Sequence, residues 1–379
     1  MKAKIFYIAD SQLPSERANS VNIAKMCEAF AQNGAKVELV IPSFQSDKVT
    51  DLELFEYYDI QRSFGLNVIK IPKIPGTLFL FAFRVAIWFL SNRKKLGMEY
   101  LIYGRSPLAI GLLAMLGFKV GIDLHGKTWK TDRLRYSTFK QIVKSKNTKL
   151  ISFNSEQLKS VFSNDYKKFI NKTLKLIALP NGSTEGGNNA HFEFQGEGGL
   201  RIGYLGSFLS GRGIDLIIRM SNEVPDAEFH LVGGPDKELK KLNDSSLPGN
   251  VYLYSHIPYK FTSTFRKGCD ILVAPYQQNV SVPSGENTVQ YMSPIKIFEY
   301  MSSGKAIICS DFPVLHNILN DENSILVEAG DLSQWVLAIN SLRDEKRRKE
   351  LGDKAYKDFL ANYTWERRAE KVLGLTLHV

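Results

Sequence analysis

The sequence predicts an α/β protein made of two doubly wound domains, each built on a parallel sheet. Its 379 residues fit two domains of the usual size better than one. Short apolar segments of strand length alternate with helical segments along both halves, which is typical of a parallel sheet covered by helices. Residues 183–199, rich in Gly, Asn and Ser, interrupt this alternation, so we expect them to link residues 1–182 to a second domain at residues 200–361.

The first half opens with a strand, a helix and a second strand. The first strand is expected at residues 4–9, and Asn19 or Ser20 caps a helix that ends at Gly34. The turn between them lacks the GxGxxG pattern, which excludes an ordinary dinucleotide-binding fingerprint. Further strands are expected at residues 36–41, 66–71, 99–103, 119–123 and 149–153, and further helices at 106–116 and 134–143.

Residues 77–90 are apolar almost throughout, with Arg84 as the exception, and three basic residues follow at 93–95. The segment is too short to cross a membrane. Two interpretations stay open at this point. The segment is either a core helix of the first domain, or an aromatic helix with basic flanks that lies in a membrane interface.

The positive charge of the chain is concentrated in its first half. The net charge is +10, and residues 1–182 hold 28 Lys and Arg against 14 Asp and Glu, while the remainder holds 21 against 25. The first half is therefore expected to face an anionic partner, such as an anionic membrane surface or a lipid-linked phosphate. For the basic region 127–149, an ordinary solvated face is the alternative. Because no nucleic-acid-binding motif is present, we expect no nucleic-acid partner.

The three cysteines predict no disulfide and no metal site. Cys27, Cys269 and Cys309 lie far apart, within apolar patterns, which is typical of buried reduced thiols in a cytoplasmic protein. A strand is expected directly at the N-terminus, so we expect no signal peptide.

His125 follows the strand predicted at residues 119–123, at its carboxyl end. Ligands of open α/β sheets bind at that edge. A lone histidine is often a structural residue, so a binding role and a structural role both stay open for His125.

The second half begins with a strand at 200–205 and a glycine-rich turn at 206–213. Such a turn before a helix, with Arg212 in it, suits an anion, although loops of this kind are common. A strand at 228–232 ends in a second turn, Gly233-Gly234. Further strands are expected at residues 250–254, 270–274, 305–309 and 323–327, and helices at 214–221, 261–267, 332–342, 344–362 and 364–373.

Ser293 and Pro294 open a helix that Gly304 ends, and Lys296 and Glu299 project from it three residues apart. The free N–H groups of this helix can bind an anion that Lys296 supports, and Glu299 can accept hydrogen bonds from a hydroxylated ring. The alternative is an ordinary i,i+3 ion pair on a surface helix.

With these segments in place, the chain resembles the retaining GT-B glycosyltransferases of family 4. The resemblance covers nearly the whole chain. It is most specific at the glycine turn 206–213, at Gly233-Gly234, and at residues 255–276 and 293–311. It implies two Rossmann-like domains facing a central cleft, with a C-terminal helix at residues 362–379 that crosses back to the first domain.

The resemblance also implies roles for single residues. Glu299 is expected to bind the ribose hydroxyls of the donor, Arg212 to contact its diphosphate, and His125 to lie against its sugar. The other residues expected in the donor site, with backbone N–H groups around residues 293–295 facing the phosphates, are Gly206, Ser207, Gly211, Gly233, Ser293, Pro294 and Ile295.

The chain departs from the family pattern at two positions. The family often has a carboxylate eight residues before the position of Glu299, where this chain has Tyr291. Glu286, in the adjoining loop, is the candidate to replace it. The family's Arg in the glycine turn is here Ser207, and Lys296 is the candidate for the lost positive charge. Both departures leave the identity of the transferred sugar open.

The implied activity is that of a retaining, metal-independent, hexosyl-type glycosyltransferase. Its co-substrate is a nucleotide-diphosphate sugar, its acceptor a glycan or lipid-linked molecule in surface polysaccharide or glycolipid biosynthesis, and it needs no cofactor. His125, Arg212 and Lys296 are expected to serve catalysis. We expect a cytoplasmic protein in peripheral contact with the inner face of an anionic membrane.

Two other functions stay open. The departures at Ser207 and Tyr291 favour a non-catalytic subunit that binds nucleotide sugars or glycans. A nucleotide-sugar epimerase of the same fold would need acid–base carboxylates beside His125.

Overall fold

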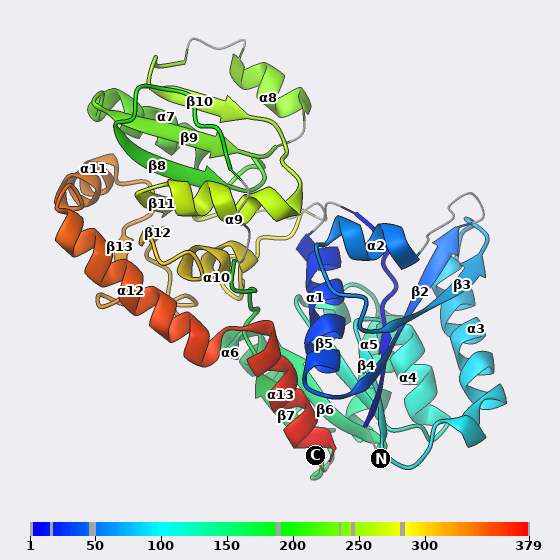
Figure 1. Cartoon of the computed structure of the whole chain (residues 1–379). Helices are drawn as coiled ribbons and strands as arrows, with labels where there is room; N and C mark the ends of the chain where they lie inside the picture. Colours follow the sequence, from blue (N-terminus) through cyan, green and yellow to red (C-terminus); the bar gives the residue numbers. More distant parts are fainter. Residues whose placement is uncertain are drawn as a thin grey trace. The chain divides into compact units, whose positions relative to one another are not determined.

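The structure is a computed structural model that describes residues 3–15, 18–44, 51–186, 191–234, 236–243, 247–280 and 285–377. The chain divides into two compact units (Figure 1). Unit 1 comprises Met1–Asn181 and Trp365–Val379, and unit 2 comprises Gly182–Thr364. Both units consist of a parallel sheet with helices, so the expected pair of Rossmann-like domains is confirmed.

Unit 1 has a seven-stranded parallel sheet in the order β3-β2-β1-β4-β5-β6-β7. The central strands are buried, as expected for a sheet covered on both faces. The strand order reverses between β1 and β4, which is where open α/β sheets bind ligands. The strands are β1 (Lys4–Ile8), β2 (Lys36–Phe44), β3 (Gly65–Ile71), β4 (Tyr100–Gly104), β5 (Val120–Leu124), β6 (Thr148–Phe153) and β7 (Lys175–Ala178).

Local capping explains where several helices of unit 1 begin. Asp132 accepts from the backbone of Arg135 at the start of α5, and Ser155 accepts from that of Leu158 at the start of α6. The α-helices of this unit are α1 (Ala18–Gln32), α2 (Asp51–Tyr57), α3 (Thr77–Ser91), α4 (Pro107–Met115), α5 (Arg133–Lys144), α6 (Glu156–Tyr166) and α13 (Trp365–Thr376). The sequence patterns did not predict α2 or α6.

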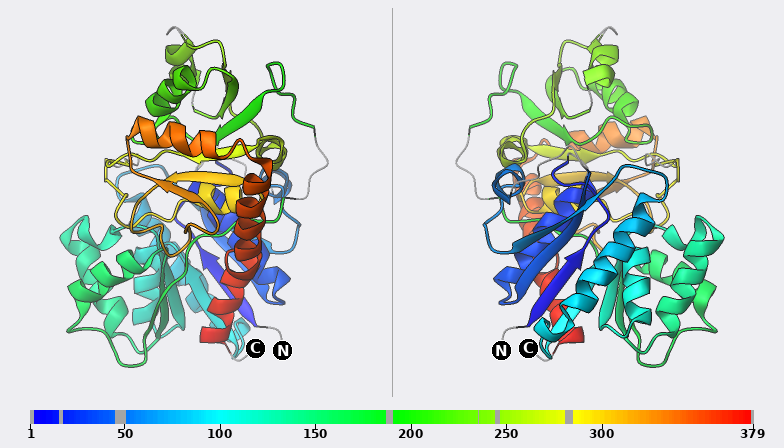
Figure 2. Two further views of the ribbon diagram at one scale, coloured as in Figure 1. Left: turned by 90° about the vertical axis from the view of Figure 1, so that its left-hand side faces the viewer. Right: turned by 90° about the vertical axis from the view of Figure 1, so that its right-hand side faces the viewer.

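The last helix of the chain belongs to unit 1. Helix α13 packs against α1 and β6, as Figures 1 and 2 show with α13 in red beside α1 in blue. Its apolar face, with Trp365, Ala369 and Val372, is buried. Asn33 at the end of α1 donates to the backbone oxygen of Glu366. The prediction that the C-terminal helix returns to the first domain is therefore confirmed, and the helix begins at Trp365.

Helix α3 resolves part of the question left open for residues 77–90. One face of α3 is buried against unit 1, with Phe81, Val85 and Phe89 in the core. The opposite face is also apolar, and it is exposed. Its exposed large side chains, with their exposed fractions, are Phe79 (51%), Phe83 (59%), Ile87 (47%) and Leu90 (45%). The helix is thus a core helix whose outer face remains available to a partner.

Unit 2 has a six-stranded parallel sheet in the order β10-β9-β8-β11-β12-β13, with its reversal between β8 and β11. The strands are β8 (Leu200–Leu205), β9 (Ala227–Val232), β10 (Val251–Tyr254), β11 (Ile271–Ala274), β12 (Ala306–Ser310) and β13 (Ile325–Val327). The helices are α7 (Ile214–Glu223), α8 (Asp236–Asn243), α9 (Tyr259–Gly268), α10 (Ile295–Met301), α11 (Leu332–Ser341) and α12 (Glu345–Asn362). Two apolar cores cover the sheet, and α8 was not predicted.

The predicted linker, residues 183–199, is not free of the second domain where the structure describes it. Phe192 and Phe194 pack against the core of unit 2, with Phe192 against Tyr254 and Phe265. Residues 187–190 lie outside the described residues. The polar composition suggested a linker, but two aromatic side chains bury enough apolar surface to fix the segment on unit 2.

Candidate active site

The residues predicted for the site fall into two groups, each at the carboxyl edge of one sheet. His125 follows β5 in unit 1. Arg212, Lys296, Glu299 and the glycine turns belong to unit 2. The carboxyl edge of a doubly wound sheet is the usual ligand-binding edge, so both groups lie where the sequence placed them.

The glycine turn between β8 and α7 requires its glycines. Gly206, Gly211 and Gly213 all have positive φ, at 147°, 84° and 80°. A Cβ on Gly211 would lie 1.8 Å from the backbone oxygen of Asn279, and one on Gly206 would lie 2.9 Å from Nζ of Lys296. The glycine at 206 therefore leaves the space that the Lys296 ammonium group occupies.

The turn after β9 lies against the turn after β8. Gly233 has φ 121°, and a Cβ there would lie 2.2 Å from the backbone oxygen of Gly206. Gly234 packs in the same way against the ring of Phe208. The backbones of the two predicted turns thus pack directly against each other at the edge of the sheet.

Lys296, in the first turn of α10, extends over two aromatic rings. Its Nζ lies 3.7 Å from the centroid of the Tyr204 ring and 5.5 Å from that of Tyr276. Burial, and then the charge of Arg212, lower the pKa of Lys296 well below its usual value. Among the residues that the structure describes, Lys296 forms no ion pair with Glu299, so the i,i+3 surface pair is not what is observed.

Arg212 brings a second cation to the same place. Its guanidinium carbon lies 5.7 Å from the Tyr276 ring. Its Nε is buried, and within the described part of the chain it has no hydrogen-bond partner. Neither Arg212 nor Lys296 pairs with a carboxylate there, so the two repel each other over one aromatic platform. A bound anion would relieve this repulsion and supply the missing hydrogen bonds.

Glu299 lies one turn after Lys296 on α10 and is half-buried. Its charge favours the protonated form of Lys296 without a direct ion pair. The sequence suggested that Pro294 lies in the first turn of the helix. The structure places it one position earlier, at the N-cap, because its ψ of 124° is extended. Helix α10 has only seven residues, so the field of its N-terminus is weak and the side chains of Arg212 and Lys296 supply most of the positive charge.

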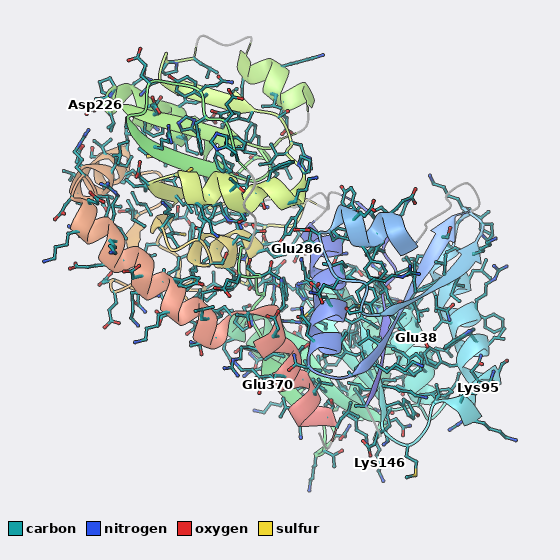
Figure 3. All side chains as sticks on the ribbon, in the orientation of Figure 1. Glu38, Lys95, Lys146, Asp226, Glu286 and Glu370 are labelled. Carbon is teal, nitrogen blue, oxygen red and sulfur yellow. The ribbon has the colours of Figure 1, made fainter. Side chains whose placement is uncertain are left out.

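The loop before α10 places Glu286 beside Tyr291, the position at which the resemblance expects a carboxylate (Figure 3 labels Glu286). Tyr291 is 1% exposed. Burial, and then the Glu286 carboxylate, raise the pKa of Tyr291. A carboxylate therefore lies near position 291, although it comes from five residues earlier in the chain. Residues 281–284 of this loop lie outside the described part.

The remaining predicted donor residues lie around these groups. The backbone oxygen of Ser207 accepts a hydrogen bond from Tyr204 at 2.7 Å, which ties the glycine turn to the aromatic platform. Ser293 is buried directly before the N-cap of α10, and Ile295 is the first residue of that helix.

In unit 1, His125 is held by Asp123, two residues earlier on β5. The imidazole Nε2 lies 2.9 Å from Oδ2 of Asp123. Burial, and then the charge of Arg105, lower the pKa of His125 to about 4. The imidazole is therefore neutral near pH 7, and because the carboxylate accepts, the hydrogen is on Nε2 and Nδ1 is left as an acceptor.

Asp123 is the centre of a buried network. Its Oδ1 accepts from Arg368 Nη2 at 2.8 Å and from Ser152 Oγ at 2.7 Å. The Ser152 hydroxyl lies 2.5 Å from that of Tyr103. Burial alone would raise the pKa of Asp123, but Arg368 and then His125 outweigh it and hold the pKa well below its usual range.

The structure adds residues that the sequence reasoning did not find. Tyr204 and Tyr276 form the platform for the two cations, and Asp123 and Arg368 support His125. Tyr204 lies within the apolar strand β8, and Tyr276 follows the end of β11 by two residues, so neither position signals a ligand site in the sequence. One signal was available for Arg368, which falls on the apolar face of its helix, between Trp365 and Ala369.

The described part of the chain was also compared with the ligand sets that metal ions require. Within the described ranges, no group of three or more His, Cys, Asp or Glu side chains is arranged to hold a metal ion. The three cysteines are buried and free. Independence from metals remains a prediction.

The comparisons with known proteins concern the fold and the second half of the chain. Residues 199–345 match the family model described as glycosyl transferases group 1. No curated protein matches the sequence. Among solved structures, sucrose-phosphate synthase from Thermosynechococcus elongatus is similar over 99% of this chain and 98% of its own, with a TM-score of 0.68 and 17% identity.

Two further solved structures have the same fold. HepE from Anabaena, solved with UDP and glucose, is similar over 98% of both chains, with a TM-score of 0.67 and 14% identity. TarM from S. aureus, as a mutant with fondaparinux, alpha-GlcNAc-glycerol and UDP, is similar over 99% of this chain and 100% of its own, with a TM-score of 0.67 and 12% identity. This chain therefore has the same two-domain fold as these solved structures, and its residues 199–345 are similar to the group 1 glycosyl transferases.

Proposed function

We propose that this protein is a retaining, hexosyl-type glycosyltransferase that acts without a metal ion. It moves a sugar from a nucleotide-diphosphate sugar to a glycan or lipid-linked acceptor in surface polysaccharide or glycolipid biosynthesis. The observation that carries the proposal is the pair of cations, Arg212 and Lys296, which lie on one aromatic platform beside the glycine turn without a carboxylate partner in the described part of the chain.

The donor diphosphate is the anion that this platform would hold. Arg212 would donate to the phosphate oxygens through its orphaned Nε, and a bound anion would favour the charged form of Lys296. Glu299, one turn further along α10, would accept the ribose hydroxyls. The solved HepE structures contain UDP, UDP with glucose, and UDP-glucose, which makes uridine diphosphate sugars the first donors to test.

Charge stabilisation would supply most of the rate acceleration. In the transfer, the bond from the anomeric carbon to the diphosphate breaks while a bond from the acceptor oxygen forms on the same face. The negative charge grows on the leaving phosphate oxygen, where two fixed cations stabilise it. The acceptor hydroxyl passes its proton to that phosphate, so no separate general base is required. Neutral His125, with Nδ1 unprotonated, would accept a hydrogen bond from a sugar hydroxyl.

The test is transfer from a panel of nucleotide sugars to mixed glycan and lipid-linked acceptors, with and without a metal chelator. We expect one donor to be consumed, with retention at the anomeric carbon and no effect of the chelator. Binding of a nucleotide sugar without turnover across all acceptors would instead favour the non-catalytic subunit. That alternative is suggested by Tyr291, which stands where the family often has a carboxylate. Conversion of the donor without an acceptor would favour the epimerase.

We also propose that unit 1 contacts an anionic membrane through the outer face of α3. In the described part of the chain, no helix is both long and apolar enough to cross a membrane. The exposed apolar side chains of α3 are Phe79, Phe83, Ile87 and Leu90. Phe79 also lines a groove of about 750 Å³, together with Leu134, Arg133 and Arg135. Exposed basic residues 93–95 follow the helix, and Figure 3 labels Lys95. Apolar side chains flanked by cations suit the interface of an anionic bilayer.

Vesicle sedimentation tests this contact. Phosphatidylglycerol vesicles should bring down the wild-type protein at low salt, and phosphatidylcholine vesicles should not. Phe83→Ser should weaken binding about tenfold, because one exposed aromatic ring no longer enters the interface. Leu337→Ser removes a comparably exposed apolar side chain (67% against 59% for Phe83) from α11 in unit 2 and serves as the matched control. Equal loss in both variants would contradict the assignment to α3.

A further inference from the structure

The strongest unexplained feature of the molecule is an ion pair buried in unit 1 between the end of β5 and the last helix of the chain. Arg368 of α13 donates to Oδ1 of Asp123 at 2.8 Å, and their side chains are 3% and 0% exposed. The same guanidinium group donates through Nε to the backbone oxygen of Pro180 at 3.1 Å. Arg368 thus joins three segments that are far apart in the sequence.

A contribution to stability does not by itself explain a buried ion pair of this kind. Taking both charges out of water is costly, and well-packed apolar residues of similar volume often stabilise a protein as much or more. The apolar residues that surround Arg368 on α13 already fix the helix to unit 1. A role in the neighbouring site would account for keeping the two charges.

The geometry at Asp123 shows how such a role would work. The carboxylate uses its two oxygens for different partners: Oδ1 for Arg368 and Ser152, and Oδ2 for His125. With Oδ1 held on two sides, the carboxylate cannot rotate. The direction of Oδ2 fixes the plane of the imidazole and keeps the hydrogen on Nε2.

We propose that Arg368 is a positioning residue for His125, and that the terminal helix completes the site in unit 1 by carrying it. The guanidinium group balances the charge of Asp123 and holds its carboxylate still. The imidazole is thereby kept in one orientation and one tautomer, with Nδ1 directed to accept a hydrogen bond. The consequence for turnover rests on the proposed function, in which His125 meets a substrate hydroxyl.

The charges that face His125 decide the direction of the expected effect. They are Asp123 on its own strand, Arg105 after β4, and Arg368 on α13. The carboxylate raises the pKa of His125, and both arginines lower it. Removal of Arg368 leaves Asp123 with one fewer cation, so the imidazole becomes its main counter-ion and binds a proton more readily.

The experiment measures the protonation of His125 directly by ¹⁵N-edited NMR of the full-length protein over pH 4–8. In the wild type we expect the Nε2–H tautomer and a pKa of about 4. In Arg368→Gln we expect the pKa to rise toward the ordinary histidine value near 6.5. Arg367→Met, on the same helix but with an exposed side chain paired to Glu370, should leave His125 unchanged.

Three results would overturn the proposal. The first is a wild-type His125 that carries its hydrogen on Nδ1 or titrates near 6.5. The second is an unchanged His125 pKa in a folded Arg368→Gln protein. If that variant does not fold, Arg368→Lys decides, because one ammonium group cannot replace the arginine fork. The third result is an Nε2 chemical shift of His125 in Arg368→Lys that equals the wild-type value.

These readouts need neither donor nor turnover, so they stand even if no nucleotide sugar is transferred. Where a donor is accepted, the acid limb of kcat/KM should move from near pH 4 toward pH 6.5 in Arg368→Gln, with little change in the donor Kd. A merely structural arginine would lower the amount of folded enzyme and leave the position of that limb unchanged.

Discussion

Charged side chains are arranged in opposite ways at the carboxyl edges of the two sheets. At the edge of unit 1, the Asp123 carboxylate is surrounded by Arg368, Ser152 and His125, and all of these contacts lie within 3 Å. At the edge of unit 2, Arg212 and Lys296 lie over the same tyrosine ring, without a carboxylate partner among the described residues. At the first edge, the Asp123 carboxylate has partners on both oxygens without a ligand and holds a neutral imidazole still. The second is strained by like charges and gains stability when an anion binds.

The largest expected effect concerns the sheet edge of unit 2, where Arg212 and Lys296 lie. Arg212→Met and Lys296→Met should each weaken binding of a nucleoside diphosphate about 10- to 100-fold, as expected for a lost hydrogen bond from a cation worth ~1.5–3 kcal/mol. Isothermal titration calorimetry measures this loss. Arg219→Met, an exposed cation on α7, is the matched control. If all three variants bind with the affinity of the wild type, the cation platform is not the diphosphate site.

A second prediction tests whether the glycine turn is needed to shape that edge. Gly211→Ala should destabilise unit 2 by about 1–3 kcal/mol, because φ is 84° and the new Cβ would lie 1.8 Å from a backbone oxygen. Thermal unfolding and donor binding report the change. Gly249→Ala meets nothing within 4 Å and should be nearly neutral. Equal stability of the two variants would mean that the turn adapts freely.

The third and smallest expected effect concerns the sheet edge of unit 1 and is measured as the pH dependence of stability. The pKa of His125 is about 4 in the folded protein against 6.5 in the unfolded chain, so the unfolded chain binds more protons between these values. Stability should therefore fall by roughly 1–2 kcal/mol as pH drops from 7.5 to 5, and His125→Gln should remove that loss. His256→Gln, at an exposed position, is the control.

Two other groups must be separated from His125 in that experiment. His230 also has a pKa lowered to about 4 by burial, so the His125 variant should remove only its own share of the slope. Asp123 has a depressed pKa, and its contribution to stability is lost only below the ordinary aspartate range. Denaturant melts at pH 7.5, 6 and 5 resolve the histidine window. A slope that is identical in the wild type and in His125→Gln would contradict a neutral imidazole.

Local chemistry made much of the fold predictable. The apolar runs that became β1, β4, β5, β8 and β11, and the stops at Gly34 and Gly304, could be read because their signals lie within a few residues. Helices α2 and α8 were missed because they are short, with seven and eight residues. Helix α6 was missed although Ser155 caps it and Leu158, Phe162 and Tyr166 form a buried face at helical spacing. The segment that contains Phe192 and Phe194 was predicted to be a linker because its composition is polar. Its two aromatic side chains nevertheless pack against the core of unit 2.

The sequence by itself determined the alternation of strands and helices, the glycines at the turns, and the residue types at the sheet edges. Those features depend on neighbours in the chain. Only the tertiary structure decided that Lys296 lies on Tyr204 rather than on Glu299, that Glu286 lies beside Tyr291, and that Arg368 reaches Asp123. Each of these is a contact between side chains whose directions depend on the packing of whole elements, and spacing along the chain does not encode it.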